Sequence, residues 1–160
     1  MKYIIQYLSA LILFIFSTFA AWYEGSAIRE NPWEWKYTAF FSNINNAWII
    51  DGSDISQLDH FIYAAKLYPV YPILMVLSLS YLVILSGYLL LKNDTKKLNI
   101  FLFSFGFIQF LLGLMVSDSP TVGGKTFTVT LLTIGMISSV IPFLIMKKRY
   151  RKKRNLNLLH

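Results

Sequence analysis

The chain has 160 residues, of which 56% are hydrophobic and only 14% charged, whereas about a quarter of the residues of a soluble domain are charged. This composition excludes an ordinary soluble globular protein and indicates a membrane protein. The absence of cysteine excludes a disulfide framework and a thiolate zinc site. The formal net charge of +7 does not predict a nucleic-acid partner, because nothing beyond charge supports one.

Four long apolar segments predict four transmembrane helices, since about 20 apolar residues cross a hydrocarbon core roughly 30 Å thick. None of these segments contains Asp, Glu, Lys, Arg or His. The predicted spans are residues 4–23, 67–91, 98–116 and 126–146. We therefore expect an all-α membrane protein, a four-transmembrane-helix bundle that forms one membrane domain over residues 1–160.

The first span has an alternative interpretation as a cleaved signal peptide. Lys2 precedes the apolar run, and Ala20 and Ala21 near its end resemble a cleavage site. The run is longer than the roughly 7–15 apolar residues of a signal peptide. Trp22 and Tyr23 close it, as aromatic residues do at a membrane interface. These features favour a retained helix.

Basic residues predict the orientation in the membrane. Eleven of the fifteen Lys and Arg residues fall on the side of the chain termini, and four on the other side. The positive-inside rule therefore predicts a multi-pass protein of the cell membrane with both termini in the cytoplasm and residues 24–66 outside. The tail, residues 147–160, is expected to bind anionic lipid headgroups. Its basic residues are Lys147, Lys148, Arg149, Arg151, Lys152, Lys153 and Arg154.

The outer loop, residues 24–66, carries the aromatic residues that we predict to contact a partner. Three of them, Trp33, Trp35 and Tyr37, alternate with polar residues, and a period of two places them on one face of a β-strand. Residues 47–50, with Trp48, would be the partner strand of a β-hairpin. An irregular loop whose tryptophans lie at the membrane interface is an equal alternative.

Residues 54–66 predict a short amphipathic helix in the membrane interface. Its apolar positions recur at helical spacing: Ile55, Leu58, Ile62 and Ala65. Asp59, His60 and Lys66 fall mostly on the other face, which is expected to be solvated. His60 and the nearby aspartates are too few ligands for tight transition-metal binding. We expect no metal, no cofactor and no catalytic residue.

Small and polar residues in the last two spans predict helix packing faces. Gly106, Gln109 and Gly113 lie on one stripe of the third span, and Gly135 and Ser139 form a similar stripe on the fourth. The alternative interpretation is that Gln109 lines a pore or substrate path. Residues 123–126, Gly-Gly-Lys-Thr, imitate the end of a phosphate-binding loop, but its first glycine would fall at Ser119.

Two segments carry a family resemblance. Residues 21–26, Ala-Trp-Tyr-Glu-Gly-Ser, and residues 31–37, Asn-Pro-Trp-Glu-Trp-Lys-Tyr, resemble an uncharacterised Bacillus family of small multi-pass membrane proteins, a domain of unknown function. The resemblance implies a Gram-positive plasma membrane and brings no activity. In outline the chain is also similar to claudin-type four-span proteins, although it lacks the cysteines of their large first loop.

These features favour a non-enzymatic membrane protein whose outer loop contacts a partner protein, the cell wall or lipid headgroups. A small-molecule or ion permease subunit is the alternative. Permeases usually place ionisable residues within their spans, and this chain has none there.

Overall fold

The computed structural model describes residues 1–45 and 49–157, and this part of the chain contains helices and no strand. Its long helices are α1 (Lys2–Gly25), α5 (Val70–Leu91), α6 (Thr95–Val116) and α7 (Val122–Asn157). Four segments are long and apolar enough to cross a membrane: Lys2–Glu30, Val70–Leu91, Thr95–Val116 and Val122–Leu144. The prediction of an all-helical chain with four such segments is confirmed, and a multi-pass membrane protein is plausible.

The connection between α1 and α5, residues 26–69, is built from short helical elements. They are the 3₁₀ helix η1 (Ser26–Glu30), α2 (Pro32–Thr38), α3 (Phe40–Asn45), the 3₁₀ helix η2 (Gly52–Asp54) and α4 (Gln57–Leu67). Two of these elements, η2 and α4, start at a residue whose side chain caps the helix. The carboxylate of Asp51 caps η2, and the hydroxyl of Ser56 accepts the N–H of Leu58 at the start of α4. We refer to residues 26–69 below as the connection.

The predicted β-hairpin is wrong. Residues 32–38 form the helix α2, in which Pro32 occupies the first turn, where it costs no hydrogen bond, and Glu34 lies near the positive end of the helix dipole. In a helix, Trp33 and Tyr37 share a face because they are four residues apart, while Trp35 points elsewhere. An alternation of aromatic and polar residues over such a short segment does not distinguish a strand from a helix. Trp48, which was predicted to lie on the second strand and to contact a partner, is outside the described residues, as are residues 46 and 47.

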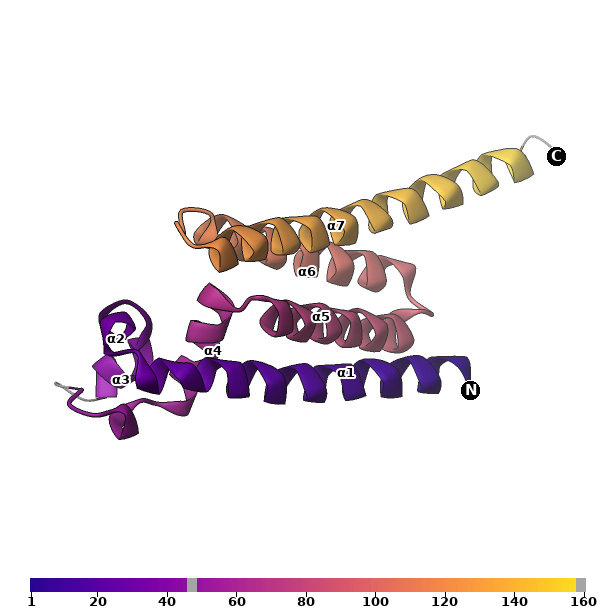
Figure 1. Ribbon diagram of the computed structural model, residues 1–160. Coiled ribbons are helices and arrows are strands. Elements are labelled where there is room, and N and C mark those ends of the chain that lie inside the picture. The colour runs from indigo at the N-terminus through magenta and orange to yellow at the C-terminus, as the bar shows by residue number, and fades with distance from the viewer. Residues whose placement is uncertain (46–48, 158–160) are drawn as a thin grey trace. The chain divides into compact units, whose positions relative to one another are not determined.

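The chain divides into two compact units, of which the first comprises Met1–Leu82 and Asp118–Phe127. Within it, α1 lies against α4 and against the first half of α5 (Figure 1), where the rings of Phe16 and Tyr71 meet edge to face with centroids 6.0 Å apart. The buried face of α1 consists of small residues at helical spacing: Ala10, Ser17, Ala21 and Gly25. Small side chains let neighbouring helices approach closely.

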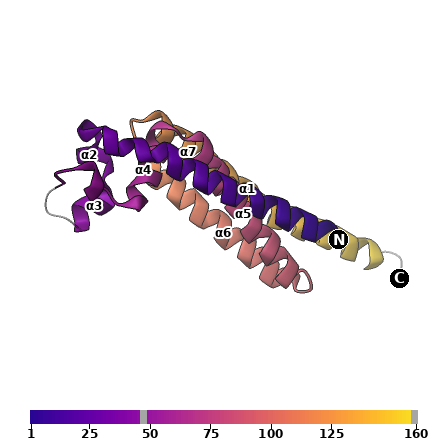
Figure 2. The ribbon, with the colours of Figure 1, turned by 60° about the horizontal axis from the view of Figure 1, so that its bottom comes forward.

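The connection has a small apolar core of its own within this unit. Ile28, Ala39, Ile55 and Tyr63 are buried together, and Trp35 packs against them. The four buried residues come from η1, α4 and the segments next to α2 and η2, so the core ties the short helices to one another. Both ribbon views show α2 and α3 beyond the C-terminal end of α1 and close to α4 (Figure 2).

The second unit comprises Val83–Ser117 and Thr128–His160. In it α6 and α7 approach closely at glycines. A Cβ atom on Gly106 would lie 2.5 Å from Oγ of Ser139 and 2.8 Å from the carbonyl oxygen of Gly135, which is too close for any side chain. At Gly113 a Cβ atom would touch Leu132 at 3.0 Å. These glycines therefore permit the spacing of α6 and α7.

Candidate functional site

A buried carboxylate organises the connection. Asp59 on α4 is fully buried, and its Oδ1 accepts the N–H of Phe41 at 2.8 Å. Its Oδ2 accepts both the N–H and the hydroxyl of Ser42, at 2.8 and 2.5 Å. The hydroxyl oxygen of Ser42 in turn accepts the N–H of Ser56 at 2.7 Å. The carboxylate thus satisfies free N–H groups at the start of α3 and holds that helix to α4.

His60, the next residue on α4, is also fully buried. Its ring lies beside the indole of Trp22 on α1, with centroids 5.7 Å apart. Neither ring nitrogen has a hydrogen-bond partner within the described residues. Burial, followed by the positive charge of Arg29, lowers the pKa of His60 below its ordinary value, and the main chain of Trp22 and the charge of Asp59 oppose this shift only in part.

These positions correct the predicted orientation of the short helix. It begins at Gln57, and its buried residues are Asp59, His60, Tyr63 and Ala64, whereas the predicted apolar contact Leu58 is half exposed. The expectation of a solvated face for Asp59 and His60 is therefore wrong. No local pattern in the sequence marks this burial, because the groups that satisfy Asp59 belong to α3, 17 and 18 residues earlier in the chain.

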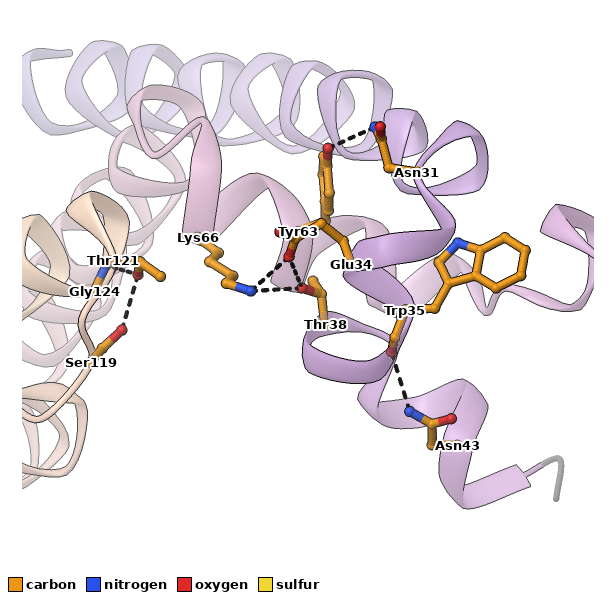
Figure 3. A network of polar contacts seen from close by, with 10 residues as sticks. All are labelled: Asn31, Glu34, Trp35, Thr38, Asn43, Tyr63, Lys66, Ser119, Thr121 and Gly124. Atoms are coloured by element: carbon orange, nitrogen blue, oxygen red, sulfur yellow. Dashed lines mark hydrogen bonds and ion pairs between the residues drawn. The ribbon is translucent and has the colours of Figure 1, made fainter. Parts of the chain in front are cut away.

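Polar contacts also fix α2 and the residues before it. The indole N–H of Trp35 donates to the carbonyl oxygen of Ile28 at 2.8 Å. The side-chain amide of Asn31 donates to the hydroxyl oxygen of Tyr63 at 3.0 Å, which joins the start of α2 to α4 (Figure 3). Burial raises the pKa of the Tyr63 hydroxyl above its ordinary value of 10.0.

An ion pair joins α2 to the end of α4. The ammonium group of Lys66 donates to Oε2 of Glu34 at 2.7 Å and to the hydroxyl oxygen of Thr38 at 3.1 Å (Figure 3). The hydroxyl of Thr38 itself donates to the same carboxylate oxygen at 3.1 Å. The hydrogen bond from Lys66 is the largest cause that lowers the pKa of Glu34. In the predicted strand Glu34 would lie on the face opposite the three rings, whereas in the helix α2 its carboxylate contacts Lys66 on α4.

The aromatic residues predicted as partner contacts separate into two groups. Trp35 is half buried and anchors the connection, whereas Trp33 and Tyr37 are 89% and 70% exposed. Phe40 at the start of α3 is 58% exposed. The ammonium group of Lys66 lies 5.6 Å from the ring centroid of Tyr37, which is within the range of a cation–π interaction. We call Trp33, Tyr37 and Phe40 the aromatic surface.

The glycine pair after α6 has a structural explanation. A side chain at Gly123 would collide with the carbonyl oxygen of Ala65 at the end of α4, so glycine permits this approach. The hydroxyl oxygen of Thr121 accepts the N–H of Gly124 at 3.0 Å and lies 2.9 Å from the hydroxyl of Ser119 (Figure 3). The start of α7 is therefore capped by Thr121, the residue before it, and packed against α4.

The remaining predicted residues lie in the long helices. Gly106, Gly113, Gly135 and Ser139 lie where α6 and α7 meet, and the side chain of Gln109 is half buried on α6. The backbone of α7 stays helical to Asn157. The side chains of the seven basic residues of the tail lie outside the described part of the structure, so their binding to anionic lipid stays a prediction.

A small apolar groove lies between α1 and α4. Thr18, Phe19, Trp22 and Phe61 line it, and its volume is about 250 Å³. Ligand pockets usually hold roughly 300–1,000 Å³ and carry a few convergent polar groups. Across the described residues, no group of three or more His, Asp or Glu side chains is placed to hold a metal ion. The groove is smaller than such pockets and is lined mainly by aromatic side chains.

Comparisons with known proteins match a little over half of the chain. The family DUF4306, a domain of unknown function, matches residues 4–91, which comprise almost all of α1, the connection and all of α5. The uncharacterized protein YjdJ of Bacillus subtilis (strain 168) is 37% identical over 97 residues, which cover 58% of this chain and 85% of that protein. No solved structure matches the chain.

Proposed function

Because the chain belongs to the DUF4306 family, a domain of unknown function, we propose its role from its geometry: it is a non-enzymatic contact protein of the cell membrane. Its long helices anchor it, and the aromatic surface of the connection binds another component of the envelope. The family match includes all of residues 26–69 together with the two helices that flank them.

The observation that carries the proposal is the contrast between a fixed scaffold and exposed rings. Asp59, Trp35 and Lys66 each make contacts that hold α2, α3 or α4 in place. Trp33 and Tyr37 project from the same helix and remain largely exposed. Large rings on a preorganised scaffold bind at low entropic cost, since few torsions are lost, and tryptophan and tyrosine dominate the binding energy of many interfaces.

The charges beside the aromatic surface indicate the chemistry of its partner. The ammonium groups of Lys36 and Lys66 lie 5.7 and 5.6 Å from the ring centroid of Tyr37. Lys66 is neutralised by Glu34, whereas Lys36 is exposed. A partner that combines an apolar or aromatic group with a neighbouring carboxylate or phosphate would satisfy both the rings and Lys36.

We further propose that both termini lie in the cytoplasm and that the connection lies outside the cell. Support comes from the segregation of the basic residues, eleven of which flank the same side of the four spans. A tag placed after His160 should react with antibody only after the membrane is permeabilised. Labelling of that tag on intact cells would reject this orientation and, with it, an outer position for the aromatic surface.

The contact itself is tested by photo-crosslinking in intact cells. A photoreactive phenylalanine at position 33 should form an adduct with a defined envelope component. The same residue at position 111 on α6, where Leu111 is 44% exposed in a predicted span, should give only lipid adducts. Identical products from both positions would contradict a specific contact, and adducts with lipid alone from position 33 would restrict the surface to a membrane anchor.

Two alanine variants separate contact from folding. Trp33→Ala removes an exposed ring and should abolish the specific adduct from a probe at position 37 without changing the stability of the connection. Trp35→Ala should unfold the connection, because its indole fills part of the core and bonds to Ile28. An adduct that survives Trp33→Ala would show that the aromatic surface is not the contact.

A further inference from the structure

The crossing of α1 and α4 buries an imidazole in a tight contact. The main chain of His60 touches Gly25 so closely that a Cβ atom on the glycine would collide with the carbonyl oxygen of His60. The ring itself is fully buried and inclined at 37° to the indole of Trp22. Neither nitrogen has a hydrogen-bond partner within the described residues. A buried polar ring without partners is costly, and a buried imidazolium without partners costs more.

The surroundings of the ring oppose its protonation on balance. Burial is the largest effect, and Arg29 on η1 adds an unfavourable positive charge. Asp59 on α4 favours protonation, but its two oxygens already accept hydrogen bonds from the start of α3. On α1, the main-chain carbonyl of Trp22 also favours it as a hydrogen-bond acceptor for the protonated ring, although the ring does not meet hydrogen-bond geometry with it in this structure. The net result is a pKa of His60 below its ordinary value of 6.5.

Charged groups on the other elements packed around α4 do not change this balance. On α2, Glu34 is paired with Lys66, and Lys36 is exposed. The helix α3 (Phe40–Asn45) has no ionisable residue. The titratable residues that follow Trp22 on α1 are Tyr23 and Glu24. A proton that reaches the buried ring therefore finds no carboxylate free to accept its N–H.

We propose that His60 makes the contact between α1 and α4 an acid-sensitive lock: the neutral imidazole lets α4 close against α1, and protonation by solvent favours a form in which α4 has separated from α1. The open form binds the proton because its imidazole is hydrated. This proposal does not rest on the contact function proposed above.

Opening at His60 would reach the rest of the connection through α4. The neighbouring Asp59 holds α3, and one and two turns later Tyr63 and Lys66 hold α2. Because α2 and α3 are held to α4, separation of α4 from α1 would displace both helices that carry the aromatic surface. Acidification is expected to loosen the connection while the long apolar helices remain in the membrane.

The lock is tested by limited proteolysis of the full chain in membranes between about pH 7.5 and 5.5. Proton linkage sets the size of the effect. Between the pKa of His60 in the open form and its lower pKa in the closed form, the equilibrium constant for opening should rise by up to about tenfold for each unit by which pH falls, because one proton is taken up. The sequence has only two histidines, His60 and His160. His160→Gln should keep the pH dependence, and His60→Phe, which fills the same space without titrating, should remove it.

A direct titration keeps the proposal testable if His60→Phe fails to fold. In protein labelled at histidine, the ring resonances of His60 are identified by comparison with His160→Gln. We expect His60 to titrate below 6.5, together with the increase in proteolysis. A His60 that titrates at or above 6.5, or wild-type proteolysis that stays flat over this range, would overturn the lock. Equal pH dependence in wild type and His60→Phe would do the same.

Discussion

Replacing Asp59 by asparagine should destabilise the connection far more than an ordinary loss of surface charge. The carboxylate is fully buried and accepts three hydrogen bonds from Phe41 and Ser42 at the start of α3. Asparagine keeps the shape but turns one acceptor oxygen into an NH₂ group, which then faces one or two N–H or O–H donors. At about 1.5–3 kcal/mol for each lost bond to a charged group, we expect a cost of about 2–5 kcal/mol.

The assay is unfolding of the purified full chain in detergent, together with limited proteolysis in membranes. Asp59→Asn should lower the unfolding midpoint of the connection and expose it to protease, while the four long helices stay resistant. Glu30→Gln is the matched control, because it makes the same chemical change at an exposed carboxylate and should alter stability by about 0.5 kcal/mol or less. If both variants were equally stable, the buried carboxylate would not organise α3, and the reasoning would fail.

Trp35→Ala should cost about 3 kcal/mol, because it leaves a gap beside the small core and removes the hydrogen bond to η1, and chemical denaturation measures it. Gly106→Leu should force α7 away and lower the thermal midpoint in detergent, whereas Leu111→Phe, on an exposed position of α6, should not. The ion pair of Glu34 with Lys66 stabilises the connection above the ordinary pKa of the carboxyl, 4.5, because the folded pKa is lower. Its contribution, about 1 kcal/mol at most, should disappear as pH falls through that folded value, and a Lys66→Met variant should lack this acid loss.

Three outcomes would contradict these predictions. A Trp35→Ala variant as stable as one with alanine at the exposed Trp33 would remove the distinction between anchor and surface. Equal tolerance of leucine at Gly106 and phenylalanine at Leu111 would show that α6 and α7 do not depend on close approach. An acid loss below pH 4.5 that persists in Lys66→Met would assign it to other carboxylates.

The β-hairpin was the main error in predicting the connection. Trp33, Trp35 and Tyr37 alternate with polar residues, and seven residues are too few to separate a period of two from the first two turns of a helix. The start signal was present in Pro32, followed by Glu34, because proline in a first turn and an acidic residue near it favour a helix. The residues of the first helical turn thus indicated a helix where the hydrophobic pattern left the choice open.

The burial of Asp59 and His60 could not be predicted from their neighbours in sequence. Both residues were expected on a solvated face, since charged and polar side chains are costly to bury unless they find partners. The partners of Asp59 are main-chain N–H groups of α3, and the neighbours of His60 are Trp22 and Gly25 on α1. These groups are 17 to 38 residues away in the chain, so only folding brings them to α4.

The sequence by itself determined the parts of this protein that depend on composition and length. A run of about 20 residues without a charge is long enough to span a membrane whatever surrounds it, which is why four such helices were predicted from the sequence. The tertiary structure decided which residues of the connection are anchors and which are exposed. Trp35 and Trp33 are the same residue type two positions apart, and they differ because only Trp35 reaches the carbonyl of Ile28 and the core around it. That difference comes from the packing of η1, α2 and α4 around the small core, which no local pattern of residues contains.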